Sequence, residues 1–222
     1  MRGVFVTGTG TEVGKTYAAA MVAHSFAAEG QRVKVFKPAL TGLDEPGEPD
    51  HAILRRAARS DQSDEEIAPF RYGPPVSPHL AAAMVGEEIE REALLEAAQV
   101  AQQGADTFIC EGVGGLLTPL SLDYLVRDLI VDLAMPVAIA SPPGLGAINH
   151  TLLTIEAARS AGLRVTSVIF TPWPEDPGEI ELSNRETVAA LGATDVATLP
   201  WVDPADPDSW PGEWGLLGPP RG

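Results

Sequence analysis

The stretch Val4-Phe5-Val6-Thr7-Gly8-Thr9-Gly10-Thr11-Glu12-Val13-Gly14-Lys15-Thr16 decides the fold. It begins as an apolar, β-branched run, continues as a loop of glycine and threonine, and ends in Gly-Lys-Thr ahead of an alanine-rich segment. A strand, a glycine-rich loop and a helix in this order are typical of a phosphate-binding loop. Backbone N–H groups of such a loop and of the helix N-terminus bind polyphosphate. We therefore predict a nucleotide site in which Lys15 reaches the β- and γ-phosphates and Thr16 holds Mg²⁺.

The loop is a variant of the usual motif. Thr9 stands where the motif has its first glycine, and the nearest glycines are Gly8 and Gly10. An ordinary strand-to-helix turn with a chance Gly-Lys-Thr is the alternative interpretation.

Composition favours one folded domain. The chain has 222 residues, of which 45% are hydrophobic, and this suffices for a single domain with a sizeable core. We expect a single phosphate-loop α/β domain over residues 1–222. Residues 203–222 are rich in Pro, Gly, Asp and Trp, and we expect them to form a loosely packed tail.

Charge and apolar patterning limit the partners and the location. The net charge of −16 argues against nucleic acid and anionic membranes as partners. The sequence contains no run near the roughly 18 apolar residues that a membrane span requires. A strand is predicted almost at the first residue, so we expect no signal peptide. The one cysteine, Cys110, lies in an apolar run and is expected to be a buried thiol. These features favour the cytoplasm.

Predicted strands and helices alternate along the chain. After the first strand, strands are expected over residues 31–36, 107–110, 136–140, 165–170 and 196–199. Helices are expected after Lys15 and Asp50 and over residues 87–103, 122–133, 149–161 and 180–191, with a loop over residues 70–79. This alternation predicts a mostly parallel sheet covered by helices on both faces. Ligands bind beyond the carboxyl ends of such strands, where the phosphate loop, residues 37–42 and 111–115, and also residues 141–149, would gather.

Four charged side chains are candidates for chemistry at this edge. Glu111 ends a buried strand and Asp50 begins a helix, so both are candidate Mg²⁺ ligands, although a solvated carboxylate and a plain helix N-cap are the alternatives. Lys37 is one of only three lysines and could neutralise a transferring phosphoryl group, or it is a surface lysine before a turn. Glu12 would repel a nucleotide, so we expect it to face an amine substrate unless it points outward.

Several short segments carry a family resemblance. They are residues 6–16, Lys37-Pro38 with Thr41-Gly42, Ser77-Pro78-His79, Glu-Gly-Val-Gly-Gly at residues 111–115 and Gly-Leu-Gly-Ala-Ile-Asn-His at residues 144–150. In these segments the chain resembles the dethiobiotin synthetases. The segments also follow the order that they have in that family, and the resemblance extends to Phe170. Members of that family are ATP-dependent ligases that close the ureido ring in biotin synthesis.

The resemblance implies a reaction and roles for the candidates. An amine of 7,8-diaminononanoate captures CO₂ as a carbamate, MgATP phosphorylates the carbamate, and the second amine closes the ring to dethiobiotin with release of ADP and phosphate. It implies that Lys15 and Lys37 hold phosphoryl and carbamate oxygens and that Thr11 and Thr41 donate hydrogen bonds near the carbamate. Glu12 would lie near the diamine, and Thr16, Asp50 and Glu111 would hold Mg²⁺ as cofactor.

The resemblance also implies a nucleotide site and a homodimer. The nucleotide-binding residues would be Gly10, Thr11, Glu12, Val13, Gly14, Lys15, Thr16, Tyr17, Thr171, Pro172 and Pro200. The family often carries an adenine-reading Asn near Thr171, so a strict preference for ATP is in doubt. The substrate carboxylate would reach the subunit boundary near Gly146, Ala147 and Asn149, with Gly112 as a second candidate. Asn184 or Arg185 could replace a tyrosine that some members place against this carboxylate.

Other functions are weighed against this one. A regulatory phosphate-loop ATPase of the partition type would carry a signature lysine at position 10, where this chain has Gly10. Another cofactor-biosynthesis ligase, of the amidotransferase kind, would need a glutaminase domain with a catalytic cysteine, and 222 residues with Cys110 alone leave no room for one. A small-molecule kinase would need an Arg-rich lid, and a non-catalytic nucleotide-binding scaffold would leave Glu12 and Lys37 unexplained.

Overall fold

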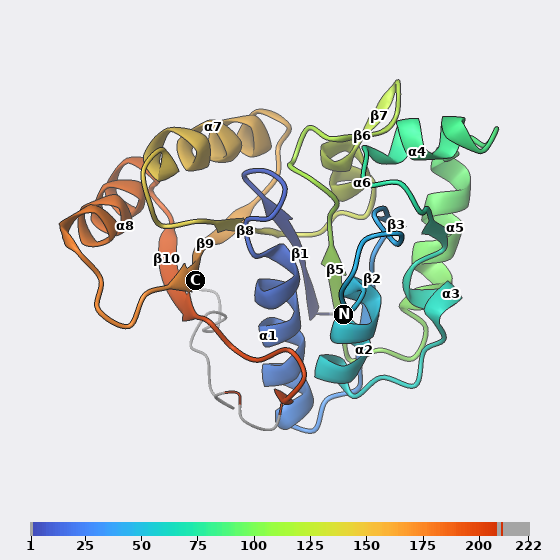
Figure 1. Cartoon of the computed structure of the whole chain (residues 1–222), viewed down its shortest axis with the longest axis horizontal. Helices are drawn as coiled ribbons and strands as arrows, with labels where there is room; N and C mark the ends of the chain where they lie inside the picture. Colours follow the sequence, from blue (N-terminus) through green and yellow to red (C-terminus); the bar gives the residue numbers. More distant parts are fainter. Residues whose placement is uncertain (1, 208–209, 211–222) are drawn as a thin grey trace.

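A parallel sheet forms the centre of the computed structural model, which describes residues 2–207 and residue 210. Among these residues the sheet has six strands in the order β10-β9-β8-β1-β5-β2 (Figure 1). The strands are β1 Arg2–Gly8, β2 Val33–Phe36, β5 Thr107–Glu111, β8 Val137–Ser141, β9 Val165–Trp173 and β10 Asp195–Pro200. Every pairing within it is parallel, so the predicted fold class is confirmed.

Helices cover both faces of this sheet (Figure 1). They are α1 Lys15–Ala28, α2 Asp50–Ala58, α3 Asp64–Ile67, α4 Pro78–Met84, α5 Arg91–Ala101, α6 Val126–Asp132, α7 Ala147–Ser160 and α8 Glu179–Gly192. Apolar residues of α1 and α2 pack on one face, and those of α5, α6, α7 and α8 pack on the other. Among residues 2–207 and 210, no helix is long and apolar enough to cross a membrane.

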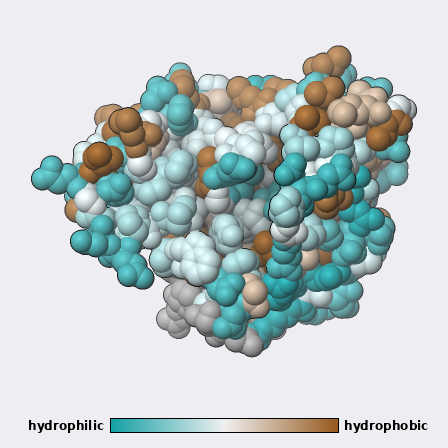
Figure 2. Space-filling model, in the orientation of Figure 1, coloured by the Kyte–Doolittle hydropathy of each residue, from teal (hydrophilic) through white to brown (hydrophobic). Residues whose placement is uncertain are grey.

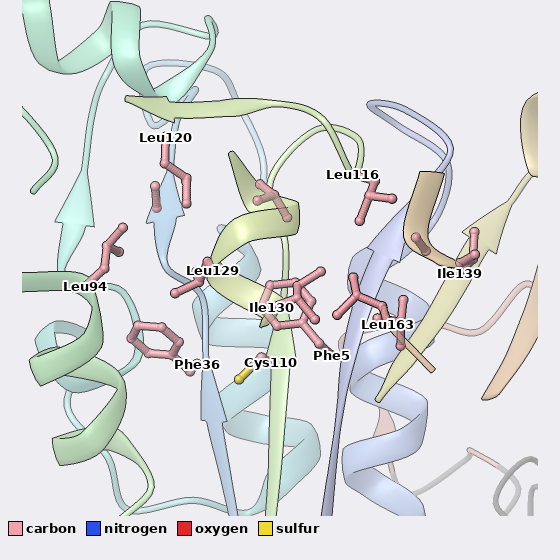
Figure 3. Packing of buried hydrophobic residues seen from close by; sticks show 14 of the residues in the cluster. Phe5, Phe36, Leu94, Cys110, Leu116, Leu120, Leu129, Ile130, Ile139 and Leu163 are labelled. Atoms are coloured by element: carbon pink, nitrogen blue, oxygen red, sulfur yellow. The ribbon is translucent and has the colours of Figure 1, made fainter. Parts of the chain in front are cut away.

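Alternation of side chains along β1 divides the core into two layers. Phe5 belongs to the layer that contains Phe36 and Leu129, where these side chains converge between the sheet and α6 (Figure 3). Val4 and Val6 belong to the layer under α1. Consecutive residues of a strand point to opposite faces, so a strand with helices on both sides must be apolar throughout. This explains why the strands are predicted from short, continuous apolar runs.

Short elements between the main ones were not predicted. Residues 70–79 were expected to form a loop, but they contain β4 Phe70–Arg71, which pairs with β3 Ala39–Leu40, and the start of α4. The helix expected over residues 122–133 begins only at Val126, because β7 Tyr124–Leu125 pairs with β6 Pro119–Ser121. The one-turn helix α3 was also missed. Elements of two to four residues contain too few positions to show a periodicity.

The C-terminal segment lies against the face covered by α1 and α2. Trp210 is buried, its Nε1 donates to Asp203 O at 2.7 Å, and its ring meets His24 edge to face at 5.5 Å. Arg56 Nη1 of α2 donates to Pro204 O at 2.6 Å. The expectation of a loosely packed tail falls mainly on residues outside the described ones, and Trp210 is well packed.

The start of α1 lies very close to the end of β9. Gly14, the N-cap of α1, has a φ of 84°, and a Cβ added there would lie 2.5 Å from Thr171 Cγ2. Thr171 is buried, so its side chain has little room to move. A glycine is therefore required at this position both by backbone conformation and by space.

We predict that Gly14→Ala destabilises the protein more than Gly104→Ala does. Both glycines have positive φ, but Gly104 has no atom within 4 Å of an added Cβ. Gly104→Ala should cost about 1–2 kcal/mol for the left-handed backbone, whereas Gly14→Ala adds an overlap worth about 1–3 kcal/mol. Urea unfolding of both variants measures the difference. Equal losses would contradict the close contact, and Thr171→Ser should recover part of the Gly14→Ala loss.

Candidate functional site

Three neighbouring strands deliver their carboxyl ends to one cavity. The phosphate loop follows β1, Lys37 follows β2 and Glu111 ends β5, and these strands are adjacent in the order β1-β5-β2. The cavity has a volume of about 770 Å³. The sequence-predicted site residues that line it are Thr11, Glu12, Val13, Gly14, Lys15, Thr16, Tyr17, Lys37, Thr41, Asp50, Glu111, Thr171, Pro172 and Pro200. Gly10 does not line the cavity, although its carbonyl accepts a hydrogen bond from Lys15 Nζ at 2.8 Å.

The phosphate loop leaves the start of α1 open. No side chain caps the first turn of α1, and no acidic residue lies in it. The N-terminal N–H groups of this 14-residue helix are therefore available to an anion. Burial, and then the charge of Lys37, lower the pKa of Lys15 to about 8. A bound phosphate group would supply a negative partner for the Lys15 ammonium and would so offset the burial and the repulsion by Lys37.

Lys37 is the centre of a buried ion cluster. Its Nζ lies 2.5 Å from Glu111 Oε1 and 2.7 Å from Asp50 Oδ2, and it donates to Gly112 O at 3.1 Å. Thr16 Oγ1 donates to the same oxygen of Glu111 at 2.9 Å. The alternatives of a surface lysine at Lys37 and a solvated carboxylate at Glu111 are therefore wrong, since the side chain of Lys37 is only 3% exposed and that of Glu111 is fully buried.

Attraction between Lys37 and Asp50 favours the charged form of each side chain despite burial. Burial alone would lower the pKa of Lys37, but Asp50 and Glu111 outweigh it and raise the pKa to about 12. Burial opposes ionisation of Asp50 as well, yet the Lys37 ammonium holds the pKa of that carboxyl below its usual value. For Glu111 burial is the largest influence and raises its pKa. Lys37 therefore stays charged at neutral pH and offers a fixed positive charge to the cavity.

The residues around Lys37 have the chemistry of a magnesium site. Thr16, Asp50 and Glu111 contribute only oxygen atoms, and Glu111 Oε2 is buried without a hydrogen-bond partner among the described residues. The described residues contain no cluster of three or more His, Cys, Asp or Glu side chains that could hold a metal ion without further ligands. Magnesium bound with a nucleotide takes one or two carboxylates and completes its shell with phosphate oxygens and water. The donor set therefore fits a nucleotide-bound magnesium ion.

Part of the cavity lining is apolar. Pro172, Pro200 and Trp201 form this part, and the Trp201 ring is well exposed. Thr171 is 2% exposed and its Cγ2 methyl faces Gly14, so it packs under the phosphate loop. A planar group entering here would meet prolines and an indole ring.

Residues at the start of α7 lie outside this cavity. Gly146 and Asn149 line a second hollow of about 450 Å³ on the surface of α7, and Ala147 is buried beside them. Asn184 Nδ2 donates to Pro143 O at 2.7 Å and Gly144 O at 2.9 Å, so its amide group holds the loop before α7. The Arg185 guanidinium lies 5.9 Å from the centre of the Trp173 ring. Within one chain, these residues are not brought to the phosphate loop.

Sequence reasoning missed several residues of the cavity. They include Glu45, Val76, Thr118 and Trp201, whereas Leu40 and Val113 lie within the ranges 37–42 and 111–115 that were expected here. Trp201 lies two residues after the predicted strand over residues 196–199 and directly follows β10, so its place near a strand end was the available signal. Val76 and Thr118 come from the segments around α4 and β6, which gave no periodic pattern.

Comparisons with known proteins identify the family of the chain. A family profile described as an AAA domain matches residues 2–209. The ATP-dependent dethiobiotin synthetase BioD of Bacillus subtilis (strain 168) is 36% identical over 192 residues, which cover 86% of this chain and 83% of that protein. The protein of the same name from Anaeromyxobacter dehalogenans (strain 2CP-1) is 37% identical over 203 residues, 90% of this chain and 91% of that protein.

Solved structures support the fold. The signal recognition particle receptor FtsY from Elizabethkingia anophelis matches with a TM-score of 0.54 and 16% sequence identity, and the match covers 95% of this chain and 62% of that chain. This likeness concerns the phosphate-loop α/β fold alone. The extent and identity of the curated matches are decisive, and the chain belongs to the family of ATP-dependent dethiobiotin synthetases.

Proposed function

We propose that this chain is a ligase of biotin synthesis that uses ATP to form dethiobiotin from 7,8-diaminononanoate and CO₂. The observation that carries the proposal is the buried ammonium of Lys37, which lies between Asp50 and Glu111 on the wall of the cavity that Lys15 also lines. A carbamate and a γ-phosphoryl group are both anionic, so their reaction requires fixed positive charge at one place. The names of the relatives give ATP and dethiobiotin, and diaminononanoate and CO₂ follow from the reaction that the resemblance implies. A regulatory ATPase or another cofactor-synthesis ligase is not favoured.

The proposed reaction has three steps. One amine of the substrate attacks CO₂ and loses a proton, which gives a carbamate. A carbamate oxygen then attacks the γ-phosphorus of ATP, the bond to the β-γ bridging oxygen breaks, and ADP leaves. The neighbouring amine attacks the carbonyl carbon of the resulting carbamic–phosphoric anhydride, expels phosphate, loses a proton and closes the ring.

The chain's own residues orient and neutralise the reactants. Lys15 and the N–H groups at the start of α1 bind the phosphates, with Gly10 to Tyr17 forming the loop around them. Lys37 neutralises oxygens of the carbamate and the γ-phosphoryl group, and Thr11 and Thr41 donate hydrogen bonds on the carbamate side. Glu12, which lines the cavity with a φ of 57°, provides a carboxylate near the diamine. Holding both reactants in line supplies a large part of the rate enhancement.

Magnesium belongs to the proposal as a cofactor. Thr16, Asp50 and Glu111 would hold it, and the unpartnered Glu111 Oε2 supports this assignment. When bound, the ion would neutralise charge on the phosphate oxygens.

We also assign the reaction to the cytoplasm, where ATP is available, and cell fractionation would test that location.

The activity assay combines the protein with diaminononanoate, bicarbonate and MgATP and follows phosphate and ureido product. We expect phosphate release only when diamine and bicarbonate are both present, because the carbamate is the phosphoryl acceptor. Lys37→Ala should lower turnover by about 100-fold or more, since one stabilising charge is lost at the reacting atoms.

Lys34→Ala is the matched control for Lys37→Ala. Lys34 lies on β2, three residues before Lys37, but pairs with the exposed Asp61, away from the cavity. It should leave turnover unchanged. Fast ATP hydrolysis without the diamine would favour a regulatory ATPase, and full turnover by Lys37→Ala would remove Lys37 from the site.

We predict weak selectivity for the nucleotide base. Pro172, Pro200 and Trp201 offer apolar and aromatic surface, which accepts any base, whereas strong discrimination requires buried hydrogen-bonding groups. Michaelis constants for ATP, CTP and GTP should agree within about tenfold. A preference for ATP of several hundredfold would contradict this assignment of the base site.

We propose that the protein acts as a homodimer through the surface at the start of α7. Leu145 and Leu153 expose apolar side chains there, and apolar residues gather along the upper edge of the molecule, where α7 lies (Figure 2). Gly146, Ala147 and Asn149, with Gly112 as the second candidate, would bind the substrate carboxylate at the subunit boundary. The helix N-terminus of α7 suits a carboxylate.

Sedimentation equilibrium tests the dimer. We expect twice the chain mass of 23.4 kDa for the natural sequence and for Val100→Glu on the distant helix α5. Leu145→Glu should give the mass of one chain, because it introduces a charge into the proposed contact. A single-chain mass for the natural sequence would exclude the dimer.

A further inference from the structure

Residues 60–67, the segment between α2 and β4, are fixed to the edge strand β2 at two points. Val35 N donates to Gln62 Oε1 at 2.8 Å, and Gln62 Nε2 donates to Val35 O at 3.0 Å. At the other end of the segment, Lys37 N donates to Ile67 O at 2.8 Å. The backbone of Lys37 is therefore positioned by the last residue of α3.

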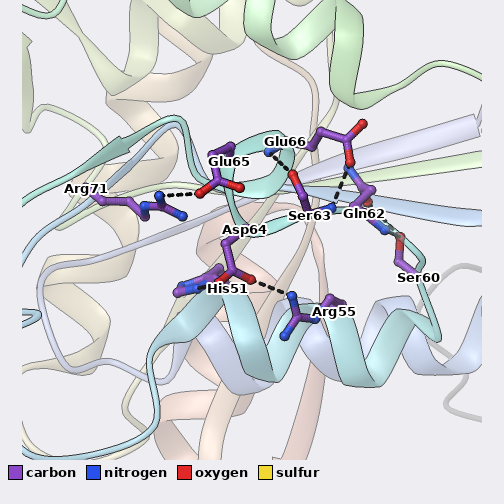
Figure 4. A network of polar contacts seen from close by, with 9 residues as sticks. All are labelled: His51, Arg55, Ser60, Gln62, Ser63, Asp64, Glu65, Glu66 and Arg71. Atoms are coloured by element: carbon purple, nitrogen blue, oxygen red, sulfur yellow. Dashed lines mark hydrogen bonds and ion pairs between the residues drawn. The ribbon is translucent and has the colours of Figure 1, made fainter.

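The same segment contacts α2 through Asp64 (Figure 4). The Asp64 carboxylate accepts a hydrogen bond from Arg55 Nη1, and its other oxygen lies 3.5 Å from His51 Nε2. His51 and Arg55 are four residues apart, so they lie on the same face of α2. His51 is buried and directly follows Asp50, the first residue of α2, so the contact with Asp64 lies at the first turn of this helix.

The helix α3 thus connects the two sides of an ion pair. Its last residue holds the backbone of Lys37, and its first residue holds the turn that carries Asp50, which pairs with Lys37 at 2.7 Å. The direct connection over residues 41–49 is mostly exposed and rich in Pro and Gly. A capping box between Ser63 and Glu66 stabilises the short α3.

We propose that Asp64 is a positioning residue that sets the place of Asp50 relative to Lys37 through His51 and Arg55. This inference rests on the proposed role of Asp50 in holding magnesium with the nucleotide. Loss of groups that contact a metal ligand weakens metal binding by about 10–100-fold, and Asp64, which acts one step further out, should give an effect at the lower end of that range. Glu65, the next residue of α3, pairs instead with Arg71, away from α2.

The test compares ADP binding with and without magnesium by titration calorimetry. Asp64→Ala should reduce the gain in ADP affinity that magnesium provides by about tenfold and leave metal-free ADP binding unchanged. Glu65→Ala removes a neighbouring carboxylate that also pairs with an arginine, and it should change neither affinity. In an Asp50→Ala background, Asp64→Ala should cause no further loss, because both changes act through one carboxylate.

Three results would overturn the proposal. They are an unchanged magnesium effect in Asp64→Ala, an equal loss of affinity with and without magnesium, or the same loss in Glu65→Ala. Asp64→Asn keeps the shape of the side chain and serves, under the same criteria, if Asp64→Ala does not fold. Failure of the proposed function is distinguishable, because it appears as absence of dethiobiotin with the natural sequence, whatever the magnesium dependence of ADP binding.

Discussion

The buried ammonium group of Lys37, placed between Asp50 and Glu111, is the interaction on which the site depends. Removing such charges from water costs several kcal/mol for each ion, and only close partners offset that cost. Lys37 finds them in two carboxylates and in the carbonyl of Gly112. Those partners come from the end of β5 and the start of α2, so the cluster requires the chain to bring distant segments together. The geometry of the site therefore depends on the order of the strands in the sheet.

Two of the three lysines lie where the reaction needs positive charge. The chain carries a net charge of −16, which repels a nucleotide and a carboxylated substrate at long range. Only three lysines are present, and Lys15 and Lys37 both line the same cavity. Both lysines are buried, and a buried charge acts more strongly on its neighbours than one at the exposed surface. The cavity is also lined by Glu12, Glu45, Asp50 and Glu111, so phosphate binding there depends on where the two ammonium groups lie and on the proposed magnesium ion.

Much of the site could be predicted because its parts obey local rules. The phosphate loop is a contiguous motif, and Lys37 and Glu111 follow apolar runs whose ends must meet in a parallel sheet. Asp50 was expected at the N-cap of a helix, but the N-cap is Pro49 and Asp50 is the first helical residue. Only the tertiary structure shows that its carboxylate lies beside Lys37. The packing of Thr171 under Gly14 is equally invisible in sequence, since it depends on how β9 approaches α1. The elements α3, β6 and β7 are too short to leave a pattern, and with α3 the contact of Asp64 with α2 was missed.

The fate of the carbamate oxygen tests the proposed chemistry most directly. The measurement supplies bicarbonate labelled with oxygen-18 to the protein, diaminononanoate and MgATP, and analyses the released phosphate by mass spectrometry before the label exchanges with water. If Lys15 and Lys37 bring a carbamate oxygen to the γ-phosphorus, each phosphate carries one labelled oxygen from the bicarbonate. Phosphate that carries no label would mean that water accepts the phosphoryl group, and would contradict the proposed reaction.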